Sequence, residues 1–186
     1  MDLSDFERLI EGSAESPSLE FKGPCPWSIN MAKDILALSN VQDGGHIVIG
    51  IQDRTLVRVG VSQAQADSYD HEAMQDQLAN LADPFVTFSV HNIVDADGKK
   101  FVVVRVQEFD EVPVVCRADS ADTKQGVVYY RSRRGRAGSR PVRDSFDMRD
   151  ILDRASVKLM AKRRGQGYVP ESTEQDNAYD EELGGL

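Results

Sequence analysis

Three acidic residues are placed where their carboxylates could cooperate in catalysis. Glu20 projects from the polar side of a predicted strand, Asp53 follows the end of a predicted buried strand, and Glu15 lies in the segment leading to Glu20. If the two strands pair, the carboxylates converge at one end of the sheet, where they need a cation to stay ionised together. Such oxygen ligands suit Mg²⁺ or Mn²⁺, which can activate water and neutralise charge on a phosphoryl group. The alternative interpretation is that all three are solvated surface acids.

A run of arginines forms the second candidate site. Residues 131–143, RSRRGRAGSRPVR, contain six arginines and no acidic residue. Arginines separated by Gly, Ser and Ala can follow a line of phosphates, and a preceding tyrosine can offer a stacking face. The alternative is a basic loop that pairs with an acidic tail of the same chain or with a partner subunit. The predicted nucleic-acid contacts are Lys22, Tyr130, Arg131, Arg133, Arg134, Arg136, Arg140 and Arg143.

The elements that position these residues follow from the hydrophobic pattern. Residues 18–22 alternate as a strand with Glu20 and Lys22 on its polar side, so Lys22 is either an ion-pair partner or a phosphate contact. Residues 46–51 form a nearly continuous apolar run, typical of a central strand covered on both faces. We expect an α+β fold, in which helices pack on a mixed sheet of five or six strands. The other predicted elements are strands at 86–94, 100–107, 112–116 and 127–131, and helices at 4–11, 28–39, 70–83 and 145–164.

Two local signals refine this prediction. Ser4 and Glu7 have the spacing of a capping box, which places the start of the first helix at Ser4. Gly44 and Gly45 precede the predicted central strand and favour a tight turn with positive φ. They lack the spacing of a phosphate-binding loop.

The composition is that of one globular domain. The chain has 186 residues, a net charge of −9 and two cysteines. It has no apolar run near the roughly 20 residues that cross a bilayer, and its acidic beginning is unlike a signal peptide. We therefore expect a cytoplasmic protein with no membrane partner, in which residues 1–164 form one domain with its core at 15–152. Residues 165–186 carry six acidic residues and no basic one, which indicates a disordered or docking tail.

Four segments occur in an order that resembles a known family. They read ESPSLEFKG, AKDILALSN, GGHIVIGIQD and, much later, GVVYYRSR. Together they resemble the Schlafen-type AlbA-like domain, a nucleic-acid-binding module of bacteria, phages and animal Schlafen proteins. The resemblance covers about residues 15–152. It implies that the four segments form the core of the domain and that the partner is RNA or DNA.

The resemblance also bears on catalysis. Some animal Schlafens are metal-dependent ribonucleases that act on structured RNA such as tRNA, and their catalytic acids fall on Glu15, Glu20 and Asp53 here. Three hypotheses follow. The first is a nucleic-acid-binding protein that uses the arginine-rich loop. The second is a Mg²⁺- or Mn²⁺-dependent endoribonuclease. The third is a structural or assembly subunit, for example of a phage, whose basic loop contacts the acidic tail of the next copy in a homo-oligomer.

Overall fold

A four-stranded mixed sheet forms the centre of the molecule. The computed structural model describes residues 1–11, 15–53, 55–134 and 137–168. The strands lie in the order β1 (Leu19–Lys22), β2 (Gly45–Ile49), β5 (Lys100–Val106) and β4 (Phe88–Val94). β1 and β2 are parallel, whereas the β2–β5 and β5–β4 pairs are antiparallel. The predicted α+β class and the predicted central position of the GHIVI strand are therefore confirmed.

The predicted number of strands in this sheet was too high. Two of the predicted strands shorten to two residues each and form separate ribbons, in which β6 (Val115–Cys116) pairs with β3 (Ala82–Asp83) and β7 (Tyr129–Tyr130) pairs with β8 (Arg140–Pro141). A side chain accounts for part of this difference. Asn40 accepts a hydrogen bond from the backbone N–H of Val114 and donates to the carbonyls of Val114 and Tyr129, so it takes backbone groups that a longer ladder would use.

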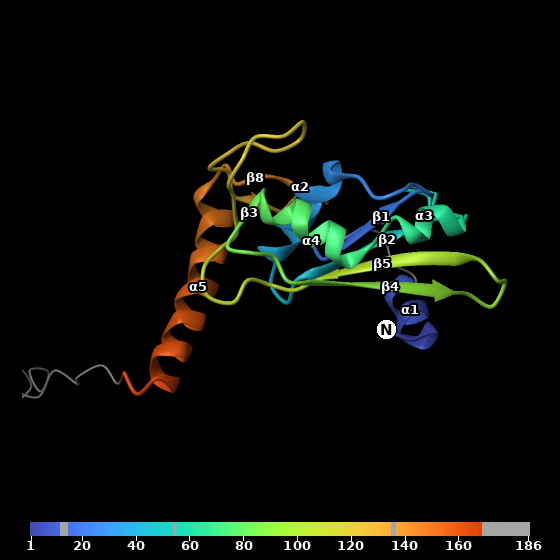
Figure 1. The fold of residues 1–186 in the computed structure, drawn as a ribbon. Helices are drawn as coiled ribbons and strands as arrows, with labels where there is room; N and C mark the ends of the chain where they lie inside the picture. The colour runs from blue at the N-terminus through green and yellow to red at the C-terminus, as the bar shows by residue number, and fades with distance from the viewer. Residues whose placement is uncertain (12–14, 54, 135–136, 169–186) are drawn as a thin grey trace, which may run out of the picture.

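One face of the sheet is covered by the crossover between its two parallel strands. The chain leaves β1, passes through the 3₁₀ turn η1 (Ile29–Met31) and α2 (Ala32–Ser39), and returns to β2. Ile35 and Leu36 pack with Ile47 and Ile49 in the larger of two hydrophobic clusters. The short α3 (Gln63–Asp67) and α4 (His71–Ala79) follow, and α4 is capped by Asp70 as predicted. Figure 1 shows α2 and α4 on the same side of the sheet.

The opposite face is covered only in part, by α1 (Leu3–Ile10). Phe6 packs against Phe101 in a second hydrophobic cluster, which also holds Val48 and Val103. The capping box belongs to Asp2 and Asp5, so the prediction that Ser4 and Glu7 form it was wrong. Asp2 accepts the N–H of Asp5, and Glu7 is free to form a bidentate pair with Arg58, with N···O distances of 2.9 and 2.7 Å.

The Gly44–Gly45 turn requires glycine for steric reasons. Gly44 has a φ of +71°, and a Cβ there would lie 2.1 Å from the carbonyl oxygen of Val106. A Cβ on Gly45 would lie 2.5 Å from the Ser18 carbonyl oxygen. The predicted tight turn is confirmed, and it lets the start of β2 lie directly against the chain that enters β1.

The long C-terminal helix α5 (Ser145–Gly165) runs away from the sheet (Figure 1). Ile151 is buried in the larger cluster, but the apolar side chains Phe146 and Leu152 are 43% and 50% exposed. Ion pairs fasten the helix instead, from Arg154 and Lys158 to Glu108. Among the described residues, no helix combines the length and the hydrophobicity that crossing a bilayer requires. The predicted tail lies outside the described residues from 169 onward.

Candidate nucleic-acid interface and the ion pairs beneath it

Arg131 is the most buried charged side chain of the arginine run. It has no exposed surface, and its Nη1 donates to Glu20 Oε2 over 2.7 Å and to Ser139 Oγ over 3.3 Å. Its other N–H groups donate, over 2.9 to 3.2 Å, to the carbonyl oxygens of Ser16, Pro17 and Leu19. Arg131 therefore ties the residue after β7 to the segment that enters β1. The prediction that this arginine contacts phosphate does not fit its burial.

Glu20 lies between two cations. Its second oxygen, Oε1, accepts from Lys22 Nζ over 3.1 Å, and Lys22 Nζ lies 2.8 Å from the buried carboxylate of Asp34 in α2. Burial alone would lower the pKa of Lys22, but the carboxylates of Asp34 and Glu20 outweigh it and raise that pKa. Lys22 is thus the ion-pair partner that one sequence interpretation proposed. The four residues Arg131, Glu20, Lys22 and Asp34 form a chain of alternating charges, which we call the ion-pair network.

Glu15 lies next to this network, and Asp53 lies close enough to act on the charge of Glu15. Burial raises the pKa of Glu15, and repulsion from Glu20 and, more weakly, Asp53 raises it further. Glu15 Oε1 also accepts the backbone N–H of Phe21, over 3.4 Å. The structure therefore brings Glu15 within electrostatic range of the other two predicted acids, Glu20 and Asp53.

The same acids do not fit a metal centre in this arrangement. Both oxygens of Glu20 already accept from cationic side chains, and Asp53 is exposed beyond the end of β2. Within the described ranges, no group of three or more His, Cys, Asp or Glu side chains is placed to hold a metal ion. The catalytic and metal-ligating roles of Glu15, Glu20 and Asp53 stay predictions.

Asn40 is a buried residue whose role the sequence did not reveal. Its side chain joins the end of α2 to the strands β6 and β7 through the hydrogen bonds described above, and its own carbonyl accepts from Arg154 of α5. Its only sequence signal was its place at the end of the AKDILALSN segment. Asn40 and the ion-pair network together connect three of the four segments that carry the family resemblance.

The arginine-rich loop is the connection between β7 and β8. Arg133 and Arg134 are exposed in its described part, and Arg140 and Arg143 are exposed at and beyond its second strand. Arg133 Nη2 donates to Gln42 Oε1 over 2.7 Å. The guanidinium carbon of Arg134 lies 3.5 Å from the centre of the Phe146 ring. Arg136 lies outside the described residues.

Tyr130 is not available as a stacking face. It is 2% exposed, and its hydroxyl donates to Asp150 Oδ2 over 2.7 Å. Burial and the Asp150 carboxylate raise the pKa of this phenol. The predicted contact between Tyr130 and nucleic acid is therefore incompatible with its packing, because the ring faces the core and the hydroxyl is committed to α5.

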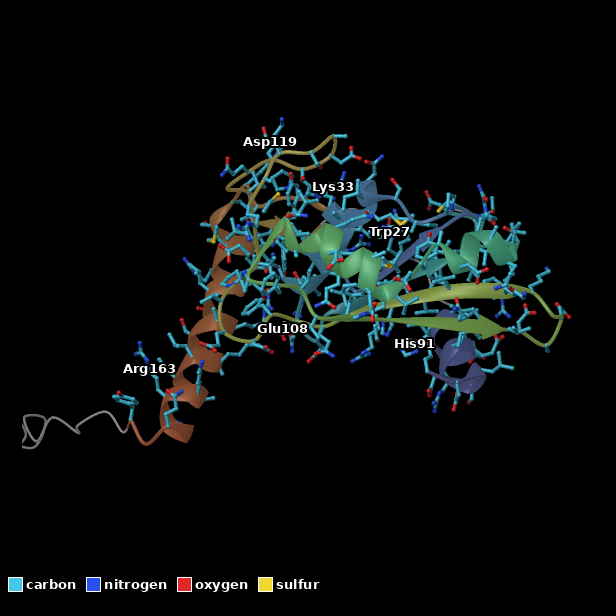
Figure 2. The ribbon with its side chains drawn as sticks, viewed as in Figure 1. Trp27, Lys33, His91, Glu108, Asp119 and Arg163 are labelled. Carbon is cyan, nitrogen blue, oxygen red and sulfur yellow. The ribbon has the colours of Figure 1, made fainter. Side chains whose placement is uncertain are left out.

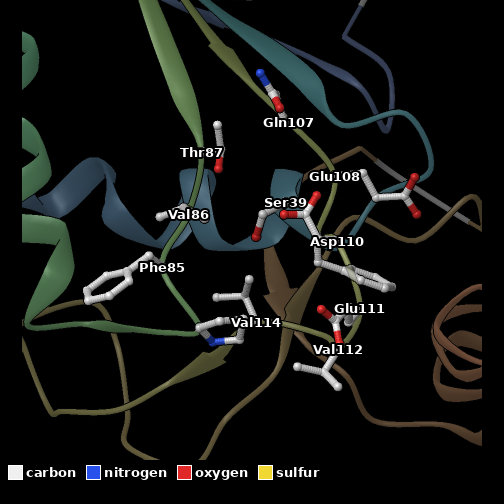
Figure 3. Close-up of a pocket in the computed structure, with 12 residues that line it drawn as sticks. Ser39, Phe85, Val86, Thr87, Gln107, Glu108, Asp110, Glu111, Val112 and Val114 are labelled. Atoms are coloured by element: carbon white, nitrogen blue, oxygen red, sulfur yellow. The ribbon is translucent and has the colours of Figure 1, made fainter. Parts of the chain in front are cut away.

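A partly open hollow of about 290 Å³ has no loop arginine among its described lining residues (Figure 3). Phe85 and Val86 line it on one side, and the acidic residues Glu108, Asp110 and Glu111 line it on another. Glu108 and Glu111 are paired with cations of α5, and none of the described lining residues is itself basic. The lining of this hollow therefore offers no cation of its own to a phosphate.

The fold and the placement of these motifs define an AlbA-like domain. The profile of the family described as Schlafen, AlbA_2 matches residues 15–137, which is more than half of the chain. The chain belongs to this family, and the family predicted from the four segments is confirmed.

The individual relatives are distant. The chain is 24% identical to a protein of Ureaplasma parvum serovar 3 described as an uncharacterized ATP-binding protein, over 65% of this chain and 38% of that one. Among solved structures, the N-terminal domain of a RecG-related protein from Nitrosomonas europaea matches with 19% identity and a TM-score of 0.46, over 78% of this chain and 96% of that domain. The DIP2311 protein of Corynebacterium diphtheriae matches with 15% identity and a TM-score of 0.48, over 75% of this chain and 29% of that one. The chain thus spans well under half the length of the curated relative.

Proposed function

We propose that this domain binds nucleic acid and that the exposed arginines of the loop between β7 and β8 contact its phosphates. Family membership supports the class of partner. The burial of Arg131 is the observation that supports this loop as the binding surface, because Arg131 anchors the base of the loop through five hydrogen bonds. A loop held at its base can present the neighbouring guanidinium groups at defined positions.

The overall negative charge does not oppose this proposal. Charges beyond a Debye length of about 8 Å at physiological salt are largely screened, so a phosphate responds chiefly to the charges closest to it. Those charges are the exposed guanidinium groups of Arg133, Arg134, Arg140 and Arg143. Contacts to phosphate position a nucleic acid without reading its sequence, so we expect weak sequence preference.

The test compares two triple variants of equal charge. R133Q/R140Q/R143Q removes three exposed arginines of the interface, and K99Q/R117Q/K124Q removes three exposed cations elsewhere. Binding of a labelled DNA duplex is measured by fluorescence anisotropy over a range of salt concentrations. Loss of three phosphate contacts should flatten the log–log salt dependence by up to about 2.7, at about 0.9 per contact, and the control should leave it unchanged. Equal binding by both variants would show that the loop is not the interface.

The ribonuclease and assembly hypotheses stay predictions. The proximity of Glu15 to Glu20 and Asp53 favours the ribonuclease hypothesis, and the pairing of Glu20 with Arg131 and Lys22 opposes it. The assembly hypothesis needs a basic loop, which is exposed, and an acidic tail, which lies outside the described residues. The cytoplasmic location likewise stays a prediction.

A further inference from the structure

Among the described residues, hollows lie over part of the sheet face on the α1 side, and basic side chains line them. His46 of β2, Arg105 of β5 and Ser89 of β4 lie directly beside one another in the strand register, and His91 follows two residues after Ser89. Side chains on a strand alternate between the two faces, so His46 shares its face with Val48 and Arg105 shares its face with Val103. Val48 and Val103 pack in the α1 cluster. The basic side chains His46, Arg105 and His91 therefore lie on the same face of the sheet as α1, beyond the valines that α1 covers.

The contacts within this group leave donors available to a ligand. Arg105 Nη1 donates to His46 Nε2 over 3.3 Å, which uses one of five guanidinium N–H groups. His91 Nε2 lies 3.0 Å from Ser89 Oγ, and His91 Nδ1 lies 3.5 Å from the amino group of Met1. Arg105 is exposed, while the two histidines are half-buried. Figure 2 shows His91 on the α1 side of the sheet, opposite Lys33.

Two shallow hollows of about 470 and 480 Å³ meet over this group. Leu9, His46 and Arg105 line both of them. The first hollow extends to Gln42 and the Gly44–Gly45 turn, and the second extends to Arg8 and His91. The acidic groups at their edges are Asp43 and Asp5, and Asp5 is paired with Arg8. Cationic and neutral donors therefore outnumber acids around His46.

The titration of the histidines agrees with an excess of positive charge. Burial lowers the pKa of His46 to about 4, and the nearby Arg105 and His91 add to this effect. Burial also lowers the pKa of His91, as do the amino group of Met1 and Arg105. The groups facing these imidazoles are Arg105 from β5, Arg8 and Asp5 from α1, Asp43 from the turn before β2, and the Met1 amino group. An anion bound among them would supply the missing negative charge and favour protonation.

The first hollow touches the arginine-rich loop. Gln42 lines it, and Gln42 Oε1 accepts the hydrogen bond from Arg133 described above. A nucleic-acid backbone that lies along Arg133 and Gln42 can therefore reach the glycine turn and Arg105, which line the same hollow.

We propose that the hollow over His46 and Arg105 binds a further phosphate of the nucleic acid that the arginine-rich loop contacts. This inference rests on the proposed function. The guanidinium of Arg105 donates to the phosphate, and His46 and His91 each gain a second N–H donor by taking up a proton as the phosphate arrives. Binding therefore takes up protons, and affinity rises as the pH falls from about 7.5 towards 5.5.

The binding experiment uses R105Q, H46Q and the control R117Q. Arg105 and Arg117 are both exposed, but Arg117 follows β6, whose Cys116 packs in the cluster on the opposite face of the sheet. We expect R105Q to flatten the salt dependence of duplex binding by about 0.9, as one lost phosphate contact should, and H46Q to reduce the gain in affinity at low pH. R117Q should behave like the wild type in both respects. If R133Q/R140Q/R143Q weakens binding while R105Q and H46Q bind like R117Q, the phosphate site in the hollow is refuted and the proposed function stands.

A second measurement separates the hollow from the nucleic acid. The histidine ring protons are followed by NMR across the same pH range, with and without inorganic phosphate. Phosphate should raise the pKa of His46 and His91 in the wild type, and less so in R105Q. If the wild type binds neither DNA nor RNA but shows this shift, the proposed function fails and the anion site stands. If phosphate leaves both pKa values unchanged and the R105Q variant binds nucleic acid as the wild type does, the inference is wrong.

Discussion

Breaking the pair between Glu20 and Arg131 should destabilise the whole domain. Removing one partner of a buried ion pair costs about 3–5 kcal/mol, because the other charge is left buried without compensation. Two features reduce this figure for Glu20→Gln. The side chain of Glu20 is 14% exposed, and Arg131 keeps its three carbonyl acceptors. We therefore expect a loss of about 2–3 kcal/mol in the free energy of unfolding.

Arg131→Met should cost more, about 4 kcal/mol. This change removes all five hydrogen bonds of the guanidinium group and leaves Lys22 as the cation paired with Glu20. The Pro17 carbonyl also loses its donor, whereas the Ser16 and Leu19 carbonyls keep the backbone N–H groups of Leu19 and Ser16. A buried acceptor without a donor costs about 1–3 kcal/mol, so the two effects reinforce each other.

Urea unfolding followed by circular dichroism measures both losses. With a slope of about 2 kcal/mol per molar urea, Glu20→Gln should lower the midpoint by about 1–1.5 M. Glu72→Gln, at an exposed position of α4, is the matched control and should change the free energy by no more than about 0.5 kcal/mol. The double variant E20Q/R131M should lose less than the two single variants together, with a coupling of about 1–3 kcal/mol. A Glu20→Gln midpoint equal to that of Glu72→Gln, or strict additivity in the double variant, would refute the reasoning.

Three further predictions concern the neighbouring groups. Glu15→Gln should stabilise the protein at neutral pH, opposite in sign to Glu20→Gln. The pKa of Glu15 is raised in the folded state, so the free energy of unfolding falls as the pH rises through the titration of Glu15. Urea unfolding at acidic and at neutral pH checks this. The wild type should lose stability as the pH falls from about 6.5 to about 4, because in this window His46 is protonated in the unfolded chain but not in the folded protein. Thermal unfolding of His46→Gln should show a smaller loss of stability over the same window than the wild type. Incubation with tRNA and Mn²⁺ should give binding without cleavage, because both carboxylate oxygens of Glu20 already accept hydrogen bonds. Cleavage seen on a gel would instead support the ribonuclease hypothesis if a chelator stops it and Glu20→Gln abolishes it.

Strong periodicity made most of the fold predictable. The apolar run of β2 and the alternation of β5 identified the two central strands, and Asp70 correctly marked the start of α4. The number of strands in the sheet was less predictable, because it depends on hydrogen bonds between distant segments. Asn40 meets Val114 and Tyr129 across 74 and 89 residues, and no local pattern reports such contacts. The capping box was misplaced because Asp2 and Ser4 both offer an oxygen acceptor.

The candidate site was harder to predict because it depends on which way each side chain turns. Six arginines in one run look alike in a sequence, yet Arg131 is fully buried while Arg133 and Arg134 are exposed. The difference comes from Glu20, which lies 111 residues away in the chain and attracts the one guanidinium that β7 places opposite it. His46 and Arg105 were overlooked for the same reason. They are 59 residues apart and become neighbours only through the register of β2 and β5.

The ion-pair network links the stability of the fold to the choice between binding and catalysis. Glu20 would act as a ligand or base only after release from Arg131, which would leave the buried guanidinium without its carboxylate. The same pair benefits a binding function, because it fixes the base of the loop that presents Arg133 and Arg134. The buried Arg131 therefore positions the exposed arginines that follow it, Arg133 and Arg134. Since a phosphate contact needs position and exposure but no free carboxylate, the energetics of this network favour binding over cleavage.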